Sequence, residues 1–84
     1  MPRIIDGQTK NLVGPNVRKY RLLRGYSQQQ LADKLETIAV YVCRGSVSRV
    51  EEGLRTVTDI EVAGLAEILD VPIMVLFGVW NPPG

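Results

Sequence analysis

The chain has 84 residues, of which 45% are hydrophobic and 23% are charged, with a single cysteine and no histidine. This length predicts one compact domain, whose small core leaves no room for the deep, water-excluding pocket of a large enzyme. Cys43 alone cannot form an internal disulfide, and without histidine the sequence excludes a structural zinc site and a Cys/His nucleophile.

The net charge of +1 conceals an uneven distribution along the chain. Residues 1–50 carry nine cations and three anions, whereas residues 51–84 carry one cation and six anions. This asymmetry fits either a face that binds a polyanion or two ordinary solvated faces. The longest apolar run, Ile38–Cys43, is far shorter than the roughly 20 residues that span a membrane, and the N-terminus has no signal-peptide pattern. We therefore expect a cytoplasmic protein that does not enter a membrane.

Two helices are predicted in the first half of the chain. Pro15 suits the first turn of a helix, and apolar residues recur at helical spacing through Arg24, before Gly25 ends the pattern. Ser27 and Gln30 then form a capping-box pattern that predicts the start of a second helix. The inner face of this second helix is expected to carry Leu31, Ala32 and Leu35.

The segment between the second and third helices contains about five residues more than a tight turn needs. Ile38–Val42 is rich in β-branched residues but has no second strand with which to pair. It either packs over the core or forms a surface for a partner, and it either lengthens the second helix or forms a loop. Cys43 follows at the expected N-cap of the third helix, as a small and partly buried residue.

Three further helices are predicted in the second half. Arg44–Glu52 is expected to be helical, with Val47, Val50 and Leu54 on one apolar stripe. Gly53 is expected to end this helix.

Thr58 and Glu61 form a second capping-box pattern that predicts the fourth helix. Its apolar positions are Ile60, Ala63, Leu65, Ala66 and Leu69. Pro72 then opens a short fifth helix that ends at Gly78. The prediction is an all-α fold, a compact five-helix domain over residues 1–84 with a core at about 12–78 and with ends, 1–10 and 81–84, that fray.

The second and third predicted helices suggest a DNA-binding arrangement. Both are short, consecutive and amphipathic, as in the motif that presents its second helix to the DNA major groove. With Val47 and Val50 inward, a step of 100° per residue leaves Arg44 exposed and turns outward Gly45, Ser48, Arg49 and Glu52. Arg44 and Arg49 could each form bidentate bonds with guanine O6 and N7.

Four segments of the chain resemble the lambda-repressor-like (Cro/CI, XRE-type) helix-turn-helix family over residues 12–78. They are Arg21-Leu-Leu-Arg-Gly-Tyr-Ser-Gln-Gln-Gln-Leu-Ala, Ser46-Val-Ser-Arg-Val-Glu-Glu-Gly, Thr58-Asp-Ile-Glu and Leu65-Ala-Glu-Ile-Leu. The resemblance implies a five-helix DNA-binding domain, usually a two-fold dimer on an operator, that regulates transcription. It also implies an ion pair between Arg21 and Glu51 that ties helix one to helix three.

The resemblance and the helical wheel together assign seven residues to DNA contact. The resemblance implies a phosphate or base contact for Gln28, base contacts for the first turns of the third helix, and phosphate contacts elsewhere. The assigned residues are Gln28, Arg44, Gly45, Ser46, Ser48, Arg49 and Arg55. Two features oppose this assignment, since Gly45 offers no side chain and Glu52 would repel phosphate.

The C-terminal segment Val71–Trp80 has more apolar residues than one short helix can bury in so small a domain. It is therefore predicted to form a homodimer interface, with a lid over the core of one copy as the alternative. The residues assigned to this interface are Leu76, Phe77, Val79 and Trp80.

The sequence thus predicts a cytoplasmic, sequence-specific DNA-binding regulator, most simply a repressor, whose partners are double-stranded DNA and a second copy of itself. We expect no enzyme activity, no cofactor, no metal and no small-molecule ligand. The alternative is an antitoxin-like or adaptor module that uses the same scaffold to bind protein and has weak or no DNA binding.

Overall fold

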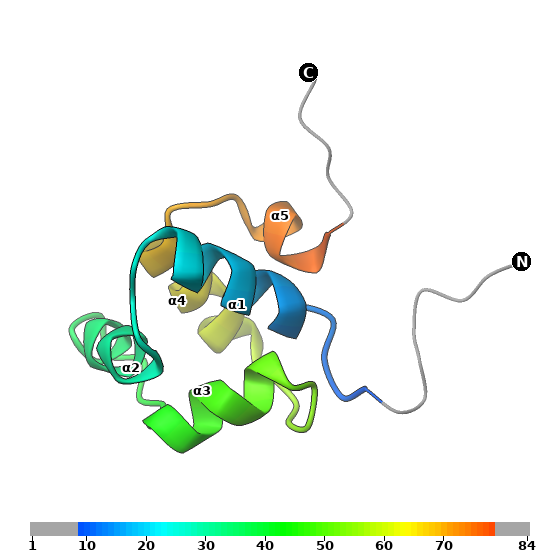
Figure 1. The fold of residues 1–84 in the computed structure, drawn as a ribbon, viewed down its shortest axis with the longest axis horizontal. Helices are drawn as coiled ribbons and strands as arrows, with labels where there is room; N and C mark the ends of the chain where they lie inside the picture. Colours follow the sequence, from blue (N-terminus) through cyan, green and yellow to red (C-terminus); the bar gives the residue numbers. More distant parts are fainter. Residues whose placement is uncertain (1–8, 79–84) are drawn as a thin grey trace, which may run out of the picture.

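The computed structural model describes residues 9–78 (Figure 1). These residues form five α-helices and no strand, which confirms the all-α prediction. The helices are α1 (Gly14–Leu23), α2 (Gln28–Glu36), α3 (Arg44–Glu51), α4 (Asp59–Leu69) and α5 (Ile73–Phe77). No helix in this part of the chain is long and apolar enough to cross a membrane. The predicted fraying of 1–8 and 81–84 lies outside the described residues.

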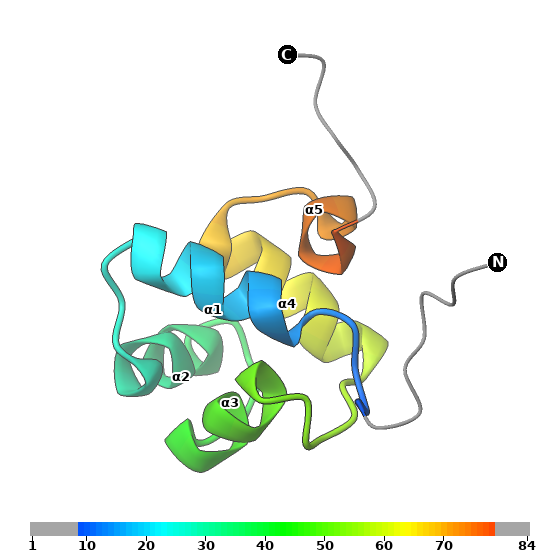
Figure 2. The same cartoon turned by 45° about the vertical axis from the view of Figure 1, so that its right-hand side comes forward.

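The helices pack around one core. Figures 1 and 2 show α1 in the middle of the domain, with α3 along one edge and α5 at the opposite edge. In Figure 1, α4 lies behind α1. α2 packs against both α3 and α4. The fully buried side chains at the centre, which come from all helices except α3 and from the segment before α1, are Val13, Val17, Leu31, Leu35, Leu69 and Leu76.

The predicted helix starts and stops agree with the structure to within one residue. At α2, Ser27 Oγ accepts from Gln30 N at 3.0 Å, and Gln30 Oε1 accepts from Ser27 N at 2.8 Å. Thr58 and Glu61 form the same reciprocal pair at the start of α4. Gly25 and Gly53 follow α1 and α3 at φ of 75° and 74°, a left-handed conformation that suits glycine.

Gly14 lets α1 approach α3 closely. A Cβ atom at Gly14 would collide with the carbonyl oxygen of Val50, in the last turn of α3. Asn11 strengthens the same contact, because its Nδ2 donates to the carbonyls of Val50 at 3.0 Å and Arg55 at 2.8 Å. The backbone N–H of Lys10 also donates to Gly53 O at 2.9 Å, so the predicted fraying is wrong for Lys10. These contacts help to fix the position of α3.

The extra residues between the second and third helices form a loop and do not lengthen α2. α2 ends at Glu36, and three backbone bonds to the end of α2 shape the loop: from Ile38 N and Val40 N to Leu35 O, and from Ala39 N to Glu36 O. Val40 is buried and Val42 partly buried against the core. The segment therefore packs over the core, as one of the two sequence alternatives predicted.

Several predicted core positions are wrong. Leu54 is 57% exposed, because the left-handed turn at Gly53 takes the chain away from the α3 stripe. Ile60 is 68% exposed and Ala63 is also exposed. α4 is rotated so that a stripe at i, i+3, i+4 and i+7 faces the core, formed by Val62, Leu65, Ala66 and Leu69.

Two further predictions need correction. Cys43 is exposed rather than partly buried, because it precedes the first turn of α3 with an extended backbone and faces solvent. Leu76 is fully buried in the core of a single copy, so its assignment to a dimer interface is wrong. Phe77 is exposed, whereas Val79 and Trp80 lie outside the described residues.

Candidate functional site

The orientation of α3 depends on a buried ion pair. Arg21, from the last turn of α1, donates from Nε to Glu51 Oε2 at 2.6 Å and from Nη2 to Oε1 at 3.0 Å. Arg21 also donates from Nη1 to the carbonyl of Tyr26, at 2.9 Å. Bonding to the Glu51 carboxylate raises the pKa of Arg21, which stays charged. The geometry confirms the predicted pair and ties α1, the α1–α2 turn and α3 together.

Gln28 joins this network at the first residue of α2. Its Nε2 donates to Glu51 Oε1 at 3.2 Å. A surface hollow between α1, α2 and α3 is lined by Arg18, Arg21, Gln28, Ser48, Glu51 and Glu52. The structure thus brings Gln28 and Ser48 together, as two hydrogen-bonding side chains beside the exposed cation Arg18. Arg18 was not predicted, since nothing in its sequence neighbourhood indicates which way that face of α1 points.

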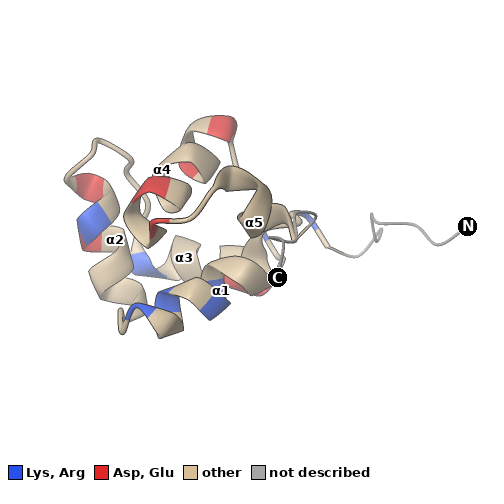
Figure 3. Cartoon of the chain, turned by 90° about the horizontal axis from the view of Figure 1, so that it is seen from above, with Lys and Arg blue, Asp and Glu red and all other residues tan. Residues whose placement is uncertain are grey.

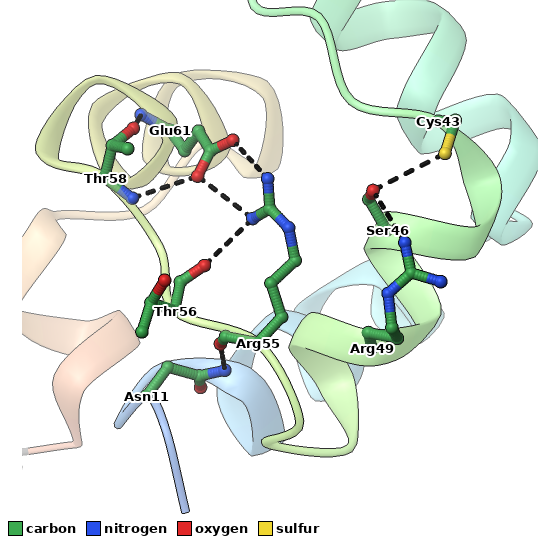
Figure 4. Close-up of polar contacts among 8 residues, drawn as sticks. All are labelled: Asn11, Cys43, Ser46, Arg49, Arg55, Thr56, Thr58 and Glu61. Carbon is green, nitrogen blue, oxygen red and sulfur yellow. Dashed lines mark hydrogen bonds and ion pairs between the residues drawn. The ribbon is translucent and has the colours of Figure 1, made fainter.

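The outer face of α3 carries the base-contact candidates. Arg44 and Arg49 are both exposed, one at each end of the helix. Arg49 Nη2 donates to Ser46 Oγ at 3.3 Å, so its guanidinium lies along the helix surface (Figure 4). A Cβ atom at Gly45 would meet only Arg49 Nη1 at 3.6 Å and Cys43 Sγ at 4.0 Å. Both are ordinary contact distances, so the fold itself does not require glycine here.

Cys43 and Ser46 mark the N-terminal turn of α3. The Cys43 thiol lies 3.4 Å from Ser46 Oγ, within hydrogen-bond distance (Figure 4). Hydrogen bonding from the Ser46 hydroxyl, and then from the Ser46 backbone, lowers the pKa of the Cys43 thiol from its ordinary value of 9.0. Ser46 thus already has two neighbours within its own turn. Residues 9–78 contain no group of acidic, cysteine or histidine side chains that could hold a metal.

Arg55 belongs to the loop between α3 and α4. Its Nη1 and Nη2 donate to the Glu61 carboxylate at 3.0 and 2.8 Å, and Nη1 also donates to the carbonyl of Thr56 (Figure 4). Bonding to Glu61 raises the pKa of Arg55, and bonding from Arg55 lowers the pKa of the Glu61 carboxyl. Because Glu61 also caps α4, the pair joins the α3–α4 loop to that helix. The sequence did not predict this pair.

The Arg55–Glu61 pair predicts an acid-dependent loss of stability. The pKa of Glu61 is lowered in the folded protein from its ordinary 4.5, so the pair stabilises the fold above that pH. This contribution is lost as the pH falls below 4.5 through the folded pKa. Glu61→Gln keeps a side chain able to cap α4 but removes the charge, and should lower the free energy of unfolding by about 1 kcal/mol near neutral pH.

The measurement is urea unfolding of both proteins at a series of pH values. The difference between wild type and Glu61→Gln should shrink toward zero in acid. Glu67→Gln, which alters an exposed carboxylate of the same helix, is the matched control and should follow the wild-type profile. A difference that stayed constant with pH would contradict an electrostatic role for the pair.

The charged residues are divided between two sides of the fold. Figure 3 shows Lys and Arg positions on α1, α2 and α3, and Asp and Glu positions along α4. The cationic side includes the exposed face of α3. The exceptions are Asp33 and Glu36 near the C-terminal end of α2, and Glu51 and Glu52 at the end of α3. The asymmetry in the sequence is therefore also an asymmetry in space.

Comparisons with known proteins agree with this geometry. The profile of the helix-turn-helix family matches residues 17–76. The fold is similar to the crystal structure of SinR, a master regulator for biofilm formation, in complex with DNA, with 28% sequence identity and a TM-score of 0.66 over 76% of this chain and 95% of that chain. It is also similar to the restriction-modification controller protein C.AhdI from Aeromonas hydrophila, with 32% identity and a TM-score of 0.68 over 77% and 91% of the two chains. No curated protein sequence matches significantly.

Proposed function

We infer that this chain, which belongs to the helix-turn-helix family, is a DNA-binding transcriptional regulator that places α3 in the major groove. The observation that carries this inference is the outer face of α3, where Arg44 and Arg49 are exposed beside a glycine. Guanidinium groups at such positions can form paired hydrogen bonds with guanine. The solved structure of the similar protein SinR with DNA supports the same conclusion.

The phosphate contacts are proposed at the edges of this face. Gln28 begins α2, the helix that crosses the DNA backbone in this motif, and it shares a hollow with Ser48 and Arg18. The carboxylates of Glu51 and Glu52 line the same hollow, but Arg18 and Arg21 balance their charge. Ser46, in the first turn of α3, is proposed to donate its hydroxyl to a second phosphate. Arg55 remains a predicted phosphate contact, and to make it the guanidinium would share its donors with Glu61.

We propose a homodimer as the active form, with each copy a single domain over residues 1–84. The exposed apolar side chains of α5 support a contact there: Ile73, Met74 and Phe77. A two-fold dimer would place its two α3 helices about 34 Å apart, on half-sites one turn of DNA apart. Repression from such an operator in the cytoplasm is the simplest consequence, because a bound dimer would compete with other proteins for that DNA.

Selection of binding sites from a random duplex library tests this proposal. We expect a two-fold motif, whose affinity falls roughly 10³-fold between 50 and 200 mM salt if each of the two copies neutralises three phosphates. A single half-site would contradict the dimer but keep the DNA-contact role. No enrichment at low salt would overturn the proposal and favour the protein-interaction module, for which Glu52 on the outer face of α3 and the exposed apolar residues of α4 and α5 are the supporting observations.

A further inference from the structure

The loop between α2 and α3 presents one aromatic side chain to solvent beside the proposed DNA face. Tyr41 is 76% exposed, the highest value among the large hydrophobic residues in the described part of the chain. Single exposed apolar residues are common, so exposure alone does not assign a function. The way in which the loop holds Tyr41 supplies the further argument.

The loop is anchored on both sides of Tyr41. Val40 is buried, and its Cγ2 would lie only 2.8 Å from a Cβ atom placed on Gly64 of α4, so the loop and α4 are in close contact. Val42 is partly buried against the same core. Burial alternates along this segment, with Val40 buried, Tyr41 exposed and Val42 partly buried, so the side chain of Tyr41 is directed outward. The backbone at Tyr41 is therefore held by a packed loop, so binding through this residue requires little loss of loop entropy.

Tyr41 lies at the end of α3 that enters the DNA in this motif. It lines one surface hollow together with Cys43, Arg44 and Ser46 from the start of α3. The N-terminal residues of a recognition helix contact base edges. Gly45 also leaves the outer side of this turn open, because a side chain there would meet no close protein neighbour. DNA that reaches Arg44 would therefore come within reach of the Tyr41 ring.

The opposite wall of the same hollow determines which part of the DNA suits Tyr41. That wall belongs to α2 and carries the carboxylates of Asp33 and Glu36. Two carboxylates repel phosphate, so the sugar-phosphate backbone is disfavoured inside the hollow, and the phosphate contact proposed for Ser46 would have to lie outside it. A base edge in the major groove carries no net charge, and the one apolar group displayed there is the 5-methyl group of thymine.

We propose that Tyr41 is a specificity-determining residue whose ring packs against a thymine methyl group next to the bases that Arg44 contacts. This inference rests on the proposed DNA-binding function and adds to it a contact from the loop inserted before α3. Replacing that thymine with deoxyuridine, which lacks only the methyl group, should weaken wild-type binding about four-fold, the effect expected for one buried methyl.

The test measures wild type and four variants on the selected site and on its single thymine-to-deoxyuridine variants. Wild type and Tyr41→Phe should both lose affinity at one thymine, because both keep the ring. Tyr41→Ala should bind the original site about four-fold more weakly and be insensitive to that replacement. Ile60→Ala, which removes a 68% exposed side chain from the acidic helix α4, is the matched control and should behave as wild type.

Each alternative result has a defined meaning. If Tyr41→Ala retains wild-type affinity and sensitivity to deoxyuridine, or if Tyr41→Phe loses as much as Tyr41→Ala, the thymine contact is overturned. Arg49→Ala in the same assay separates this failure from that of the proposed function. If Arg49→Ala weakens binding while Tyr41→Ala does not, only the loop contact is wrong. If wild type selects no DNA sequence, the proposed function fails first.

Discussion

Arg21→Ala is expected to lower the free energy of unfolding by about 3–5 kcal/mol, because it leaves a charge buried without its partner. The side chains of Arg21 and Glu51 are only 9% and 3% exposed, and two hydrogen bonds join them. Without the guanidinium, the Glu51 carboxylate would keep only the amide of Gln28 as a side-chain donor among its described contacts. For a domain whose total stability is on the order of 4–13 kcal/mol, much of the protein would unfold.

Urea unfolding measures this loss, with Arg24→Ala as the matched control. Arg24 comes from the same end of α1 and donates to the carbonyls of Leu69 and Asp70, but its residue is exposed, so its replacement should have an effect of about 1 kcal/mol or less. If Arg21→Ala does not fold, the double variant Arg21→Met/Glu51→Leu keeps the hypothesis testable. It should regain most of the lost stability, since no unpaired charge remains. A loss below about 1 kcal/mol for Arg21→Ala would contradict a structural role of the pair.

The double variant Arg44→Ala/Arg49→Ala is expected to lower the affinity for the selected DNA about 30-fold or more, since each residue should contribute about 1–3 kcal/mol to base recognition. Both side chains are exposed, so melting temperature should stay at the wild-type value. Each single variant should relax base preference at one position of the half-site. The measurement is a titration on the selected site and on each single-base variant of it.

Two controls separate base contact from general attraction. Arg44→Lys keeps the charge but loses the paired donors, so it should retain the salt dependence and lose the preference for guanine. Lys19→Ala removes an exposed cation of α1 and should weaken binding equally for all sequences, if at all. If the double variant retained both affinity and base preference, α3 would not be the recognition helix.

The helix caps and the glycines that follow α1 and α3 were predictable because the interactions that form them lie within one helical turn. The two capping boxes pair Ser27 with Gln30 and Thr58 with Glu61. The partners are three residues apart, so the first turn of one helix brings them together. Gly25 and Gly53 likewise adopt positive φ because glycine lacks a Cβ atom. The Arg21–Glu51 pair spans a separation of 30 residues, and only the family resemblance indicated it.

Errors arose where a residue's environment depends on how whole helices are oriented. Ile60 has the apolar character of a core residue, but the rotation of α4 gives its place to Val62. The sequence predicts Leu76 at a partner surface because Val71–Trp80 has more apolar residues than one short helix can bury in so small a domain. The close contact between α5 and α1 buries it within one copy.

Most of the candidate site residues lie on α3, whereas Arg55 lies in the α3–α4 loop. Arg44 and Arg49 are exposed on α3, as the helical period predicts, whereas Ser46, which only the family resemblance indicated, is half-buried. Arg55 is instead paired with Glu61, six residues away across the loop and the first turn of α4. The role of Asn11 could not be found from its neighbours either, because its acceptors Val50 and Arg55 lie 39 and 44 residues further along the chain.

The sequence by itself determined the helical class, the starts and ends of the helices and the outward residues of α3, because these follow from hydrogen bonds and periodicity within a few residues. Only the tertiary structure decided the loop that presents Tyr41, the rotation of α4 and the place of Leu76 in the core. These features result from the packing of several helices at once, in which burial of one apolar face determines which others remain exposed. A local sequence pattern does not show which of several apolar faces will be buried when the helices pack together.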